Sequence, residues 1–443
     1  MFGTGGIRGP VGETIGTKLA LRLGRALGTH ADSVVVGRDV RDSGPMLEHA
    51  LVSGITECGG SVIRVGVEST PTIARGVPWL DADFGVVITG SHNPAGDNGF
   101  KIRTDTGRVL NRDRYRSLVR RANAGTVSPA AATEIGRSTR QRDLRERHHR
   151  QLVSAFDDVE GLSVVVDLGN GTGRLTADVL TALGCDVTTL NGHCDGRFPG
   201  RGSEPTAAAC RRLSRTVQAT GADLGVAHDA DTDRLAAVDE TGRFVPGDEL
   251  FALFATYAAR EDQGVALTVD TSSLVAAAVE EAGGETVRTG VGEMAVATGL
   301  DTEGVGFGGE PSGLWIWDDD VRCPDAHFAA CKLVDLIRRE GPLSAQVAPF
   351  TDRYTTRRGC LEAGAKHDAI DRVRRRLNGE YDRVDTTDGI RIDTDDGWFL
   401  IRASGTEPVV RITADAPDRA AADRLFGRAE RLVEAAALSS KPL

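Results

Sequence analysis

The sequence predicts an α/β protein with three related domains of mixed or mainly parallel sheets, followed by a smaller α+β domain. Apolar, β-branched runs alternate with Ala-rich amphipathic stretches along most of the 443 residues, which is typical of βαβ units. After about Pro349 the order changes to strand, helix, strands and helix. We therefore expect domains over residues 1–145, 146–245, 246–349 and 350–443.

The first two predicted domains each contain a strand that ends in a polar loop. Residues 33–42 and 61–67 predict strands with a helix between them, and 84–94 predicts a buried strand that leads into a Gly-rich loop. Residues 162–191 predict a strand, a turn, a helix and a strand, and 222–239 predicts another strand whose loop is rich in carboxylates. Chemistry is expected at such strand ends.

The rest of the chain repeats this pattern and then departs from it. Residues 265–292 predict strand, helix and strand again, and 304–317 predicts a strand with a Gly-rich turn. The stretch 123–150 is rich in Arg and Ser and is interpreted as a connecting helix or linker. Residues 388–408 predict a hairpin that leads into a loop of the C-terminal domain.

Composition excludes several classes of protein. The 53 Lys and Arg against 64 Asp and Glu give a net charge of −11, which argues against nucleic acid or an anionic membrane as partner. No run of 18 apolar residues and no secretory leader pattern is present. The seven cysteines form no CxxC pair, so we expect reduced thiols and no zinc site. We expect a cytoplasmic monomer or homodimer that binds a small molecule.

The loop Thr89–Lys101 combines a hydroxyl, an imidazole, amides and an ammonium group. Ser91 is the candidate nucleophile, because a serine reacts only beside a base or in positive surroundings, and His92 and Lys101 could supply these. An ordinary Asx or Ser turn is the alternative interpretation.

The run Asp229–Arg234 spaces three carboxylates two residues apart, so in an extended loop Asp229, Asp231 and Asp233 would project to one side. Mg²⁺ prefers such oxygen ligands and often shares its shell with a phosphate. An EF-hand loop is excluded because Arg234 stands where that loop needs Gly. A solvated acidic turn remains the alternative, and Arg234 could also hold a phosphate.

Three further loops contain candidate ligand-binding residues. Glu310 and Ser312 lie in a tight Gly308–Gly313 loop where they could meet sugar hydroxyls, and Arg8 lies in the Gly-rich segment Phe2–Gly9. The segment from residue 402 to 411 has the composition of a phosphate cradle, with donors on Arg402, Ser404, Thr406, Arg411 and the backbone N–H of Gly405.

Together, these five loops resemble those of the α-D-phosphohexomutase superfamily, in the family's order and at about its spacing, over nearly the whole chain. The resemblance implies four domains around a central cleft, the fourth being TBP-like. It implies that Ser91 carries a phosphoryl group and that Asp229, Asp231 and Asp233 hold one Mg²⁺ together with it. The implied activity is that of an isomerase, an intramolecular phosphotransferase of carbohydrate metabolism.

The resemblance also implies roles for the remaining residues. Arg8 and Lys101 would serve as charge stabiliser and general acid/base, with His92 and Arg234 completing the shell around the transferring group. Glu310 and Ser312 would form hydrogen bonds with the sugar hydroxyls. The residues expected to bind the non-reacting phosphate are Arg402, Ser404, Gly405, Thr406 and Arg411.

The implied reaction converts a hexose 6-phosphate into the 1-phosphate through a sugar 1,6-bisphosphate, which also serves as activator. The total length and the Gly of RASGTEP resemble the phosphoglucosamine mutase group, whereas Gly90 resembles mannose and glucose enzymes. Glu293 and Leu314 depart from residues that many relatives carry. We expect glucosamine phosphate as substrate, with mannose, glucose or pentose phosphates as alternatives. A serine phosphatase and a non-catalytic sugar-phosphate sensor are further alternatives.

Overall fold

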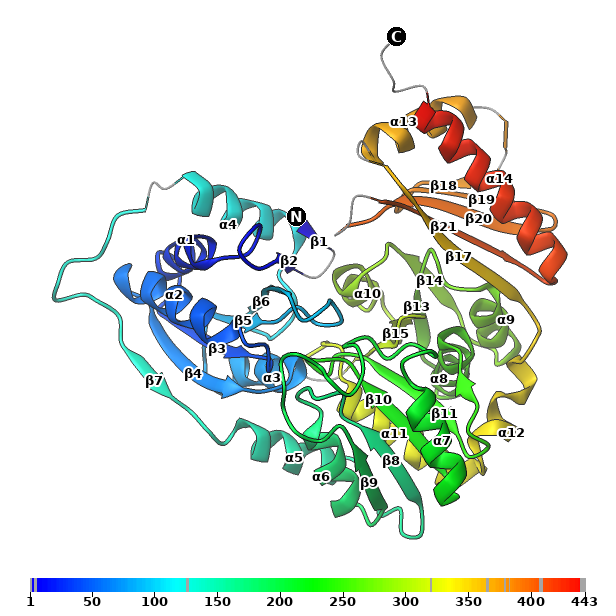
Figure 1. Ribbon diagram of the computed structural model, residues 1–443, viewed down its shortest axis with the longest axis horizontal. Helices are drawn as coiled ribbons and strands as arrows, with labels where there is room; N and C mark the ends of the chain where they lie inside the picture. Colours follow the sequence, from blue (N-terminus) through cyan, green and yellow to red (C-terminus); the bar gives the residue numbers. More distant parts are fainter. Residues whose placement is uncertain are drawn as a thin grey trace. The chain divides into compact units, whose positions relative to one another are not determined.

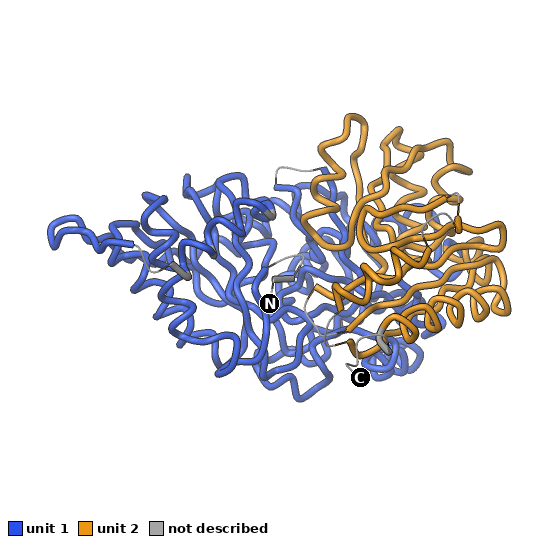
Figure 2. Tube along the Cα trace, turned by 90° about the horizontal axis from the view of Figure 1, so that it is seen from above, with its two compact units in different colours: residues 1, 3–247, 312–346 blue, residues 2, 248–311, 347–443 orange. Residues whose placement is uncertain are grey.

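The structure is a computed structural model that describes residues 2–3, 6–124, 127–318, 321–363, 366–377, 380–381, 383–405 and 409–438. The chain divides into two compact units, shown in Figure 2. The first covers residues 1, 3–247 and 312–346, and the second covers 2, 248–311 and 347–443.

The first sheet of the first unit is mixed. Its strands are β1 (Phe2–Gly3), β2 (Gly6–Pro10), β3 (Ser33–Arg38), β4 (Ser61–Val67), β5 (Phe84–Ile88), β6 (Asp97–Thr104) and β7 (Ser138–Arg140). Six of them run in the order β2-β6-β5-β3-β4-β7. β3, β4, β5 and β7 are parallel, whereas β6 is antiparallel to both β5 and β2.

Helices cover both faces of this sheet, as Figure 1 shows. They are α1 (Thr17–Gly28), α2 (Gly44–Glu57), α3 (Thr70–Trp79), α4 (Arg112–Ala124) and α5 (Leu144–Ser154). On β3, Val34 and Val36 join the core under α1, α2 and α4, while Val35 joins the core under α3 and α5. Successive side chains of a strand point to opposite faces, so a continuous valine run is what a strand buried on both faces requires.

The second sheet of the first unit has the order β12-β11-β10-β8-β9. β8, β9 and β10 are parallel, and β10 turns back into the antiparallel β11. The elements of this part are β8 (Ser163–Asp167), α6 (Arg174–Ala182), β9 (Asp186–Leu190), α7 (Arg211–Thr220), β10 (Leu224–His228), β11 (Leu235–Asp239) and β12 (Phe244–Val245). The first unit also contains β16 (Leu314–Trp317), which is not a strand of this sheet, and α11 (Ala326–Glu340).

In the second unit, β13 lies between β14 and β15 and is parallel to both. The elements here are α8 (Gly247–Arg260), β13 (Gly264–Thr268), α9 (Ser273–Glu281), β14 (Thr286–Thr289), α10 (Glu293–Gly299) and β15 (Val305–Glu310). The segment α12 (Leu343–Val347) and a 3-10 turn, η1 (Ala348–Phe350), precede the C-terminal sheet.

The C-terminal sheet of the second unit is antiparallel, in the order β17-β21-β20-β19-β18. Its elements are β17 (Thr355–Glu362), α13 (Lys366–Leu377), β18 (Val384–Asp385), β19 (Ile390–Thr394), β20 (Gly397–Ala403), β21 (Val409–Ala416) and α14 (Arg419–Leu438). The two helices share one core with the sheet. On the opposite face, Trp398 and Leu400 pack against Val269.

This architecture confirms the predicted fold class, including the strand, helix, strands and helix order after residue 350. Three local expectations were wrong. Lys101 lies within strand β6 and not on a loop, because the loop after β5 turns back to form that strand. Part of the predicted linker pairs with β4 as edge strand β7. Residues 229–233 form a tight turn, with Thr232 at φ +58°, and not an extended loop.

All seven cysteines are free thiols. Among the helices that the structure describes, each is too short or too polar to cross a bilayer.

A buried hydrogen-bond network joins four segments of the first unit. Thr176 Oγ1 lies 2.8 Å from His228 Nε2 and 2.7 Å from His327 Nδ1, and His327 Nε2 lies 3.0 Å from Ser69 Oγ. Burial lowers the pKa of His228 to about 4 and lowers that of His327 well below its ordinary value. Both imidazoles are therefore neutral in the folded protein at neutral pH.

We expect the free energy of unfolding to fall as the pH is lowered from about 7 to about 5, by up to about 1.4 kcal/mol per pH unit for each such histidine. In this window the unfolded chain binds protons that the folded chain excludes, since the folded pKa of His228 is about 4 against an ordinary 6.5. Thermal unfolding at several pH values measures this. His228→Gln should reduce the pH dependence and the exposed His30→Gln should leave it unchanged; equal slopes in all three proteins would contradict the assignment.

Candidate functional site

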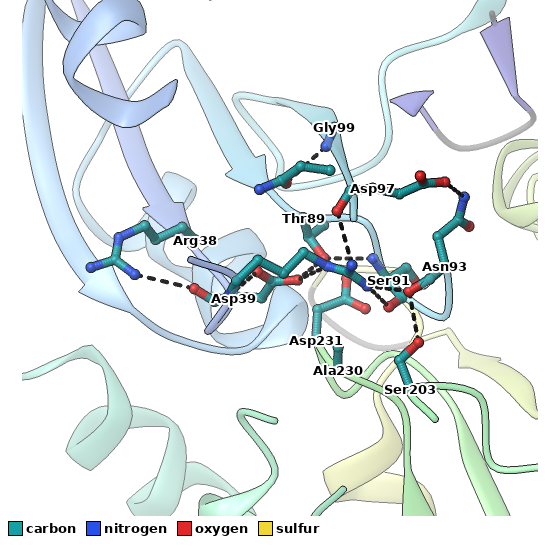
Figure 3. Close-up of polar contacts among 12 residues, drawn as sticks. Arg38, Asp39, Thr89, Ser91, Asn93, Asp97, Gly99, Ser203, Ala230 and Asp231 are labelled. Carbon is teal, nitrogen blue, oxygen red and sulfur yellow. Dashed lines mark hydrogen bonds and ion pairs between the residues drawn. The ribbon is translucent and has the colours of Figure 1, made fainter. Parts of the chain in front are cut away.

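Ser91 lies directly after β5, in the loop that leads into β6. Its side chain is fully buried, and its φ of +50° is in the left-handed region, which a non-glycine residue adopts only when its surroundings impose it. The Ser91 N–H donates to Thr89 Oγ1 over 2.7 Å, and Thr89 Oγ1 donates to Asp39 Oδ2 over 2.7 Å (Figure 3). The loop after β5 is thus tied to the end of β3.

The turn between β10 and β11 brings three carboxylates together. Asp229 Oδ1 accepts the backbone N–H groups of Asp233 and Arg234, each over 3.2 Å, which closes the turn. Oxygen atoms of Asp229, Asp231 and Asp233 lie within 4.8 Å of one another, and all three side chains are buried. The two loops meet here, because Ser91 Oγ donates to Asp229 Oδ2 over 2.8 Å and lies 3.3 Å from Asp233 Oδ1.

Lys101 supplies a buried positive charge to this carboxylate cluster. The residue lies on β6 opposite Val87 of β5, so its side chain is set by the register of the sheet. Its ammonium donates to Asp231 Oδ2 over 2.6 Å and also to Asp233 Oδ2, and it is fully buried. A buried charge of this kind is tolerated only when it is paired and hydrogen-bonded.

The carboxyl groups of this cluster differ in the direction of their pKa shifts. Burial raises the pKa of Asp229 well above its ordinary value, and the neighbouring Asp233 and Asp231 add to that rise. Burial acts in the same direction on Asp233, but the Lys101 ammonium and two guanidinium groups outweigh it and lower the pKa of Asp233. Without a further cation, Asp229 is therefore the most readily protonated of the three carboxyl groups.

The residues fit a hard divalent cation such as Mg²⁺. Asp231 Oδ1 is buried and has no hydrogen-bond partner within the described part of the chain, while Asp231 Oδ2 accepts from Thr70 Oγ1 as well as from Lys101. An anionic oxygen left unsatisfied in the interior is costly unless a ligand completes it. Together with the raised pKa of Asp229, this oxygen supports cation binding by the three aspartates.

Three further predicted residues surround the same cluster. Arg8 lies on β2 opposite Gly99 of β6 and is half-buried, and both Arg8 and Arg234 act electrostatically on Asp233. Burial lowers the pKa of His92 well below its ordinary value, with Arg234, Arg8 and Lys101 adding to the shift. The His92 imidazole is therefore neutral at neutral pH.

The other predicted residues divide between the two units. Ser312 lies in the first unit with an exposed side chain. In the second unit Glu310 ends β15, and its carboxylate accepts the backbone N–H of Gly292. Arg402 and Arg411 are paired residues of β20 and β21. Ser404 is buried and Gly405 is half-buried. Thr406 lies outside the described residues.

Asp388 joins the predicted sugar and phosphate loops within the second unit. Its Oδ2 accepts the backbone N–H of Val291 over 3.1 Å and lies 3.8 Å from Arg402 Nε. Gly292, next along the chain, donates to Glu310, so the loop before α10 contacts a predicted sugar residue directly and is linked to a predicted phosphate residue, Arg402, through Asp388. Asp388 was not predicted as a site residue, and its one signal in the sequence is its place at the start of the predicted hairpin 388–408.

Three residues of the first unit were also missed. Asp39 and Arg41 follow β3 at the same sheet edge as Ser91, and Ser203 Oγ lies 2.7 Å from the carbonyl oxygens of both His92 and Asn93. Polar residues after a parallel strand are a general signal for a site, and the run 33–42 carried it. Their role depends on loop geometry, which no local pattern encodes.

Comparisons with known proteins identify the family of the chain. Models of the four phosphoglucomutase/phosphomannomutase domains match residues 1–128 (domain I), 146–242 (domain II), 246–354 (domain III) and 358–432 (C-terminal domain). A "probable phosphoglucosamine mutase" of Methanopyrus kandleri is 41% identical over 94% of this chain and 93% of its own length. One of the same name from Methanosarcina barkeri is 39% identical over 98% of this chain and 99% of its own.

A solved structure shows the same architecture. It is that of a phosphoglucomutase/phosphomannomutase family protein from Burkholderia thailandensis, which is 29% identical and has a TM-score of 0.86. The match covers 98% of this chain and 97% of that protein's chain. With four matching domains, full-length relatives near 40% identity and this shared fold, the chain belongs to the phosphoglucomutase/phosphomannomutase family.

Proposed function

We propose that the protein interconverts glucosamine 6-phosphate and glucosamine 1-phosphate, with Ser91 as the group that carries the phosphoryl. The observation that carries this proposal is the buried Ser91 hydroxyl, 2.8 Å from Asp229 within a carboxylate cluster that Lys101 neutralises in part. The two relatives named probable phosphoglucosamine mutases support the choice of sugar.

The reaction is a transfer in two halves. In the first, a sugar hydroxyl oxygen attacks the phosphorus of phosphorylated Ser91, the bond from phosphorus to Ser91 Oγ breaks, and the hydroxyl proton passes to Ser91 Oγ. The product is the sugar 1,6-bisphosphate. In the second half Ser91 Oγ attacks the other phosphate of this intermediate and returns its proton to the sugar oxygen, so that atoms and protons balance. Lys101 and Arg8 stabilise charge at the transferring group, and Lys101 is the candidate proton relay.

The charge balance of the site suits this chemistry. Asp229, Asp231 and Asp233 face the cations Lys101, Arg8 and Arg234, three charges of each sign. A phosphoryl group on Ser91 adds about −1.5 to −2, which calls for one divalent cation. Mg²⁺ bound by the three aspartates and the phosphoryl oxygen would neutralise charge on the transferring group. His92, neutral at this position, adds no further positive charge.

Further predicted residues would fix the part of the substrate that does not react. Arg402, Ser404, Gly405, Thr406 and Arg411 are proposed to bind the second phosphate. Glu310 and Ser312 are proposed to bind sugar hydroxyls. Asp388 supports this assignment, because it holds the loop before α10 beside Arg402.

Phosphomannomutase or phosphoglucomutase activity by the same mechanism is the second candidate. Gly90 of the serine loop favours it, as does the 29% identical family protein of Burkholderia thailandensis. The substrates of the two candidates differ at the second carbon of the sugar, in its substituent and, for mannose, in its configuration. We also propose a cytoplasmic location, since seven free cysteines suit a reducing compartment.

Ser91→Ala should lower the rate of phosphoryl transfer by about a thousandfold or more while the protein still folds, because the variant has no oxygen to carry the group. ³¹P NMR of glucosamine 6-phosphate with Mg²⁺ and the 1,6-bisphosphate measures the rate. Ser53→Ala, on the exposed face of α2, is the matched control. Turnover near the wild-type rate in Ser91→Ala would reject Ser91 as the carrier.

Asp231→Asn should weaken Mg²⁺ binding by at least about tenfold, because it removes an anionic ligand while keeping the side-chain shape. Isothermal titration with Mg²⁺ measures this without turnover. Asp157→Asn, at a surface ion pair with Arg338, should bind Mg²⁺ as the wild type does. Equal affinity in the two variants would remove Asp231 from the metal site.

Glucosamine 6-phosphate should show the highest kcat/KM among the 6-phosphates of glucosamine, mannose and glucose. Parallel ³¹P NMR reactions, each with its own 1,6-bisphosphate, provide the comparison. Faster conversion of mannose or glucose phosphate would keep the mechanism and replace the substrate. Release of inorganic phosphate alone would contradict a mutase and favour the serine phosphatase.

A further inference from the structure

We propose that Arg41 is the positioning residue that holds the Ser91 loop in its reactive conformation. The inference rests on the proposed role of Ser91 and extends it by naming the group that aims the Ser91 hydroxyl at the carboxylate cluster. Arg41 follows β3 and its side chain is fully buried. It acts on the reaction through the loop backbone.

The guanidinium of Arg41 donates hydrogen bonds to several backbone carbonyl groups between residues 91 and 97. Its two terminal nitrogens donate to four carbonyl oxygens of this one loop. Nη2 lies 2.7 Å from the oxygen of Ser91 and 2.6 Å from that of Asn93, and Nη1 lies 2.5 Å from that of Pro94 and 2.9 Å from that of Asp97. Four carbonyl dipoles aimed at one point would repel one another without a cation between them.

The third guanidinium nitrogen connects the loop to β3. Arg41 Nε donates to Asp39 Oδ2 over 3.0 Å, and the same carboxylate accepts from Thr89 Oγ1 over 2.7 Å. Thr89 Oγ1 in turn accepts the backbone N–H of Ser91 over 2.7 Å. Both backbone polar groups of Ser91 are therefore set by the Asp39 and Arg41 pair, the carbonyl directly and the N–H through Thr89.

This double constraint explains how Ser91 keeps its unfavourable backbone conformation. A left-handed φ of +50° at a serine persists only where the surroundings over-determine it. With the backbone so fixed, Ser91 Oγ lies 2.8 Å from Asp229 Oδ2. A relaxed loop would turn the hydroxyl away from the carboxylates.

The site is shaped for a guanidinium and not for a general cation. A Cβ at Gly90 would lie 2.6 Å from Arg41 Cζ, so the missing side chain lets the guanidinium pack directly against the loop. The Phe198 ring lies with its centroid 5.0 Å from Cζ. A planar group with a fixed fork of donors can reach four carbonyls and a carboxylate at once, which the single ammonium of lysine cannot.

The test compares wild type, Arg41→Lys and Arg41→Ala as full-length, Mg²⁺-supplied enzymes primed with the 1,6-bisphosphate. We expect kcat to fall by about tenfold to a hundredfold in Arg41→Lys and further in Arg41→Ala, with KM within about threefold. Guanidinium chloride at millimolar concentration should restore at least tenfold of kcat in Arg41→Ala, and methylammonium chloride should not. Arg25→Ala, which breaks the surface pair with Glu57, is the control.

A second readout does not depend on turnover. Backbone hydrogen exchange in residues 89–98 should speed up at least about tenfold in Arg41→Lys, while exchange in residues 229–239 stays unchanged. Should both Arg41 variants fail to fold, Thr89→Val provides the same comparison, since it cuts the link from Asp39 to the Ser91 N–H.

The outcomes separate the two proposals. Unchanged exchange in residues 89–98, or faster exchange with unchanged kcat, would overturn the positioning role. A loss of kcat in Arg41→Ala that guanidinium does not restore would also count against it. A wild-type enzyme that neither carries phosphate on Ser91 nor converts any sugar phosphate would defeat the proposed function, and the exchange arm would still decide whether Arg41 orders the loop.

Discussion

The site of the first unit depends on one buried ion-pair cluster, the Lys101 ammonium between Asp231 and Asp233. Three carboxylates lie in one buried turn; burial raises the pKa of Asp229, and repulsion from Asp233 and Asp231 adds to the rise. Removing one partner of a buried pair typically leaves an uncompensated charge and is strongly destabilising. The carboxylates that make the turn electrostatically costly are also the groups proposed to bind a divalent cation, so the electrostatic cost and the proposed chemistry have one origin.

The mixed sheet is what makes this cluster possible. The reversal of β6 against β5 puts Lys101 opposite Val87, on the strand that follows the Ser91 loop. The turn between β10 and β11 then supplies the carboxylates from a second sheet of the same unit. Strand register positions the charged side chains, and the guanidinium of Arg41 positions the loop between them. The position of Ser91 therefore depends both on strands β5 and β6 and on the loop that Arg41 orders.

In the second unit, one carboxylate links two of the predicted binding segments. Here Asp388 accepts a backbone N–H of the loop before α10 and lies beside Arg402, so residues from two sheets are linked by one carboxylate. The C-terminal sheet packs against this part through Trp398, Leu400 and Val269. Asp388 thus links the loop before α10 to the C-terminal sheet within the second unit.

Much of this protein could be predicted from its sequence because the relevant signals are local. Alternating apolar runs predicted the α/β domains, the run of three aspartates predicted a cation site, and the serine loop predicted a nucleophile at the end of β5. Five loops in a fixed order also carried the resemblance to a family that the comparisons then confirmed.

Only the tertiary structure decided how these signals combine. It placed Lys101 on a strand, turned the aspartate run into a closed turn, and gave Asp39, Arg41 and Asp388 their contacts. Arg41 bonds carbonyl oxygens some 50 residues away along the chain. A backbone carbonyl has no identity in the sequence, so a residue whose partners are main-chain atoms of a distant loop can be recognised only once the chain has folded.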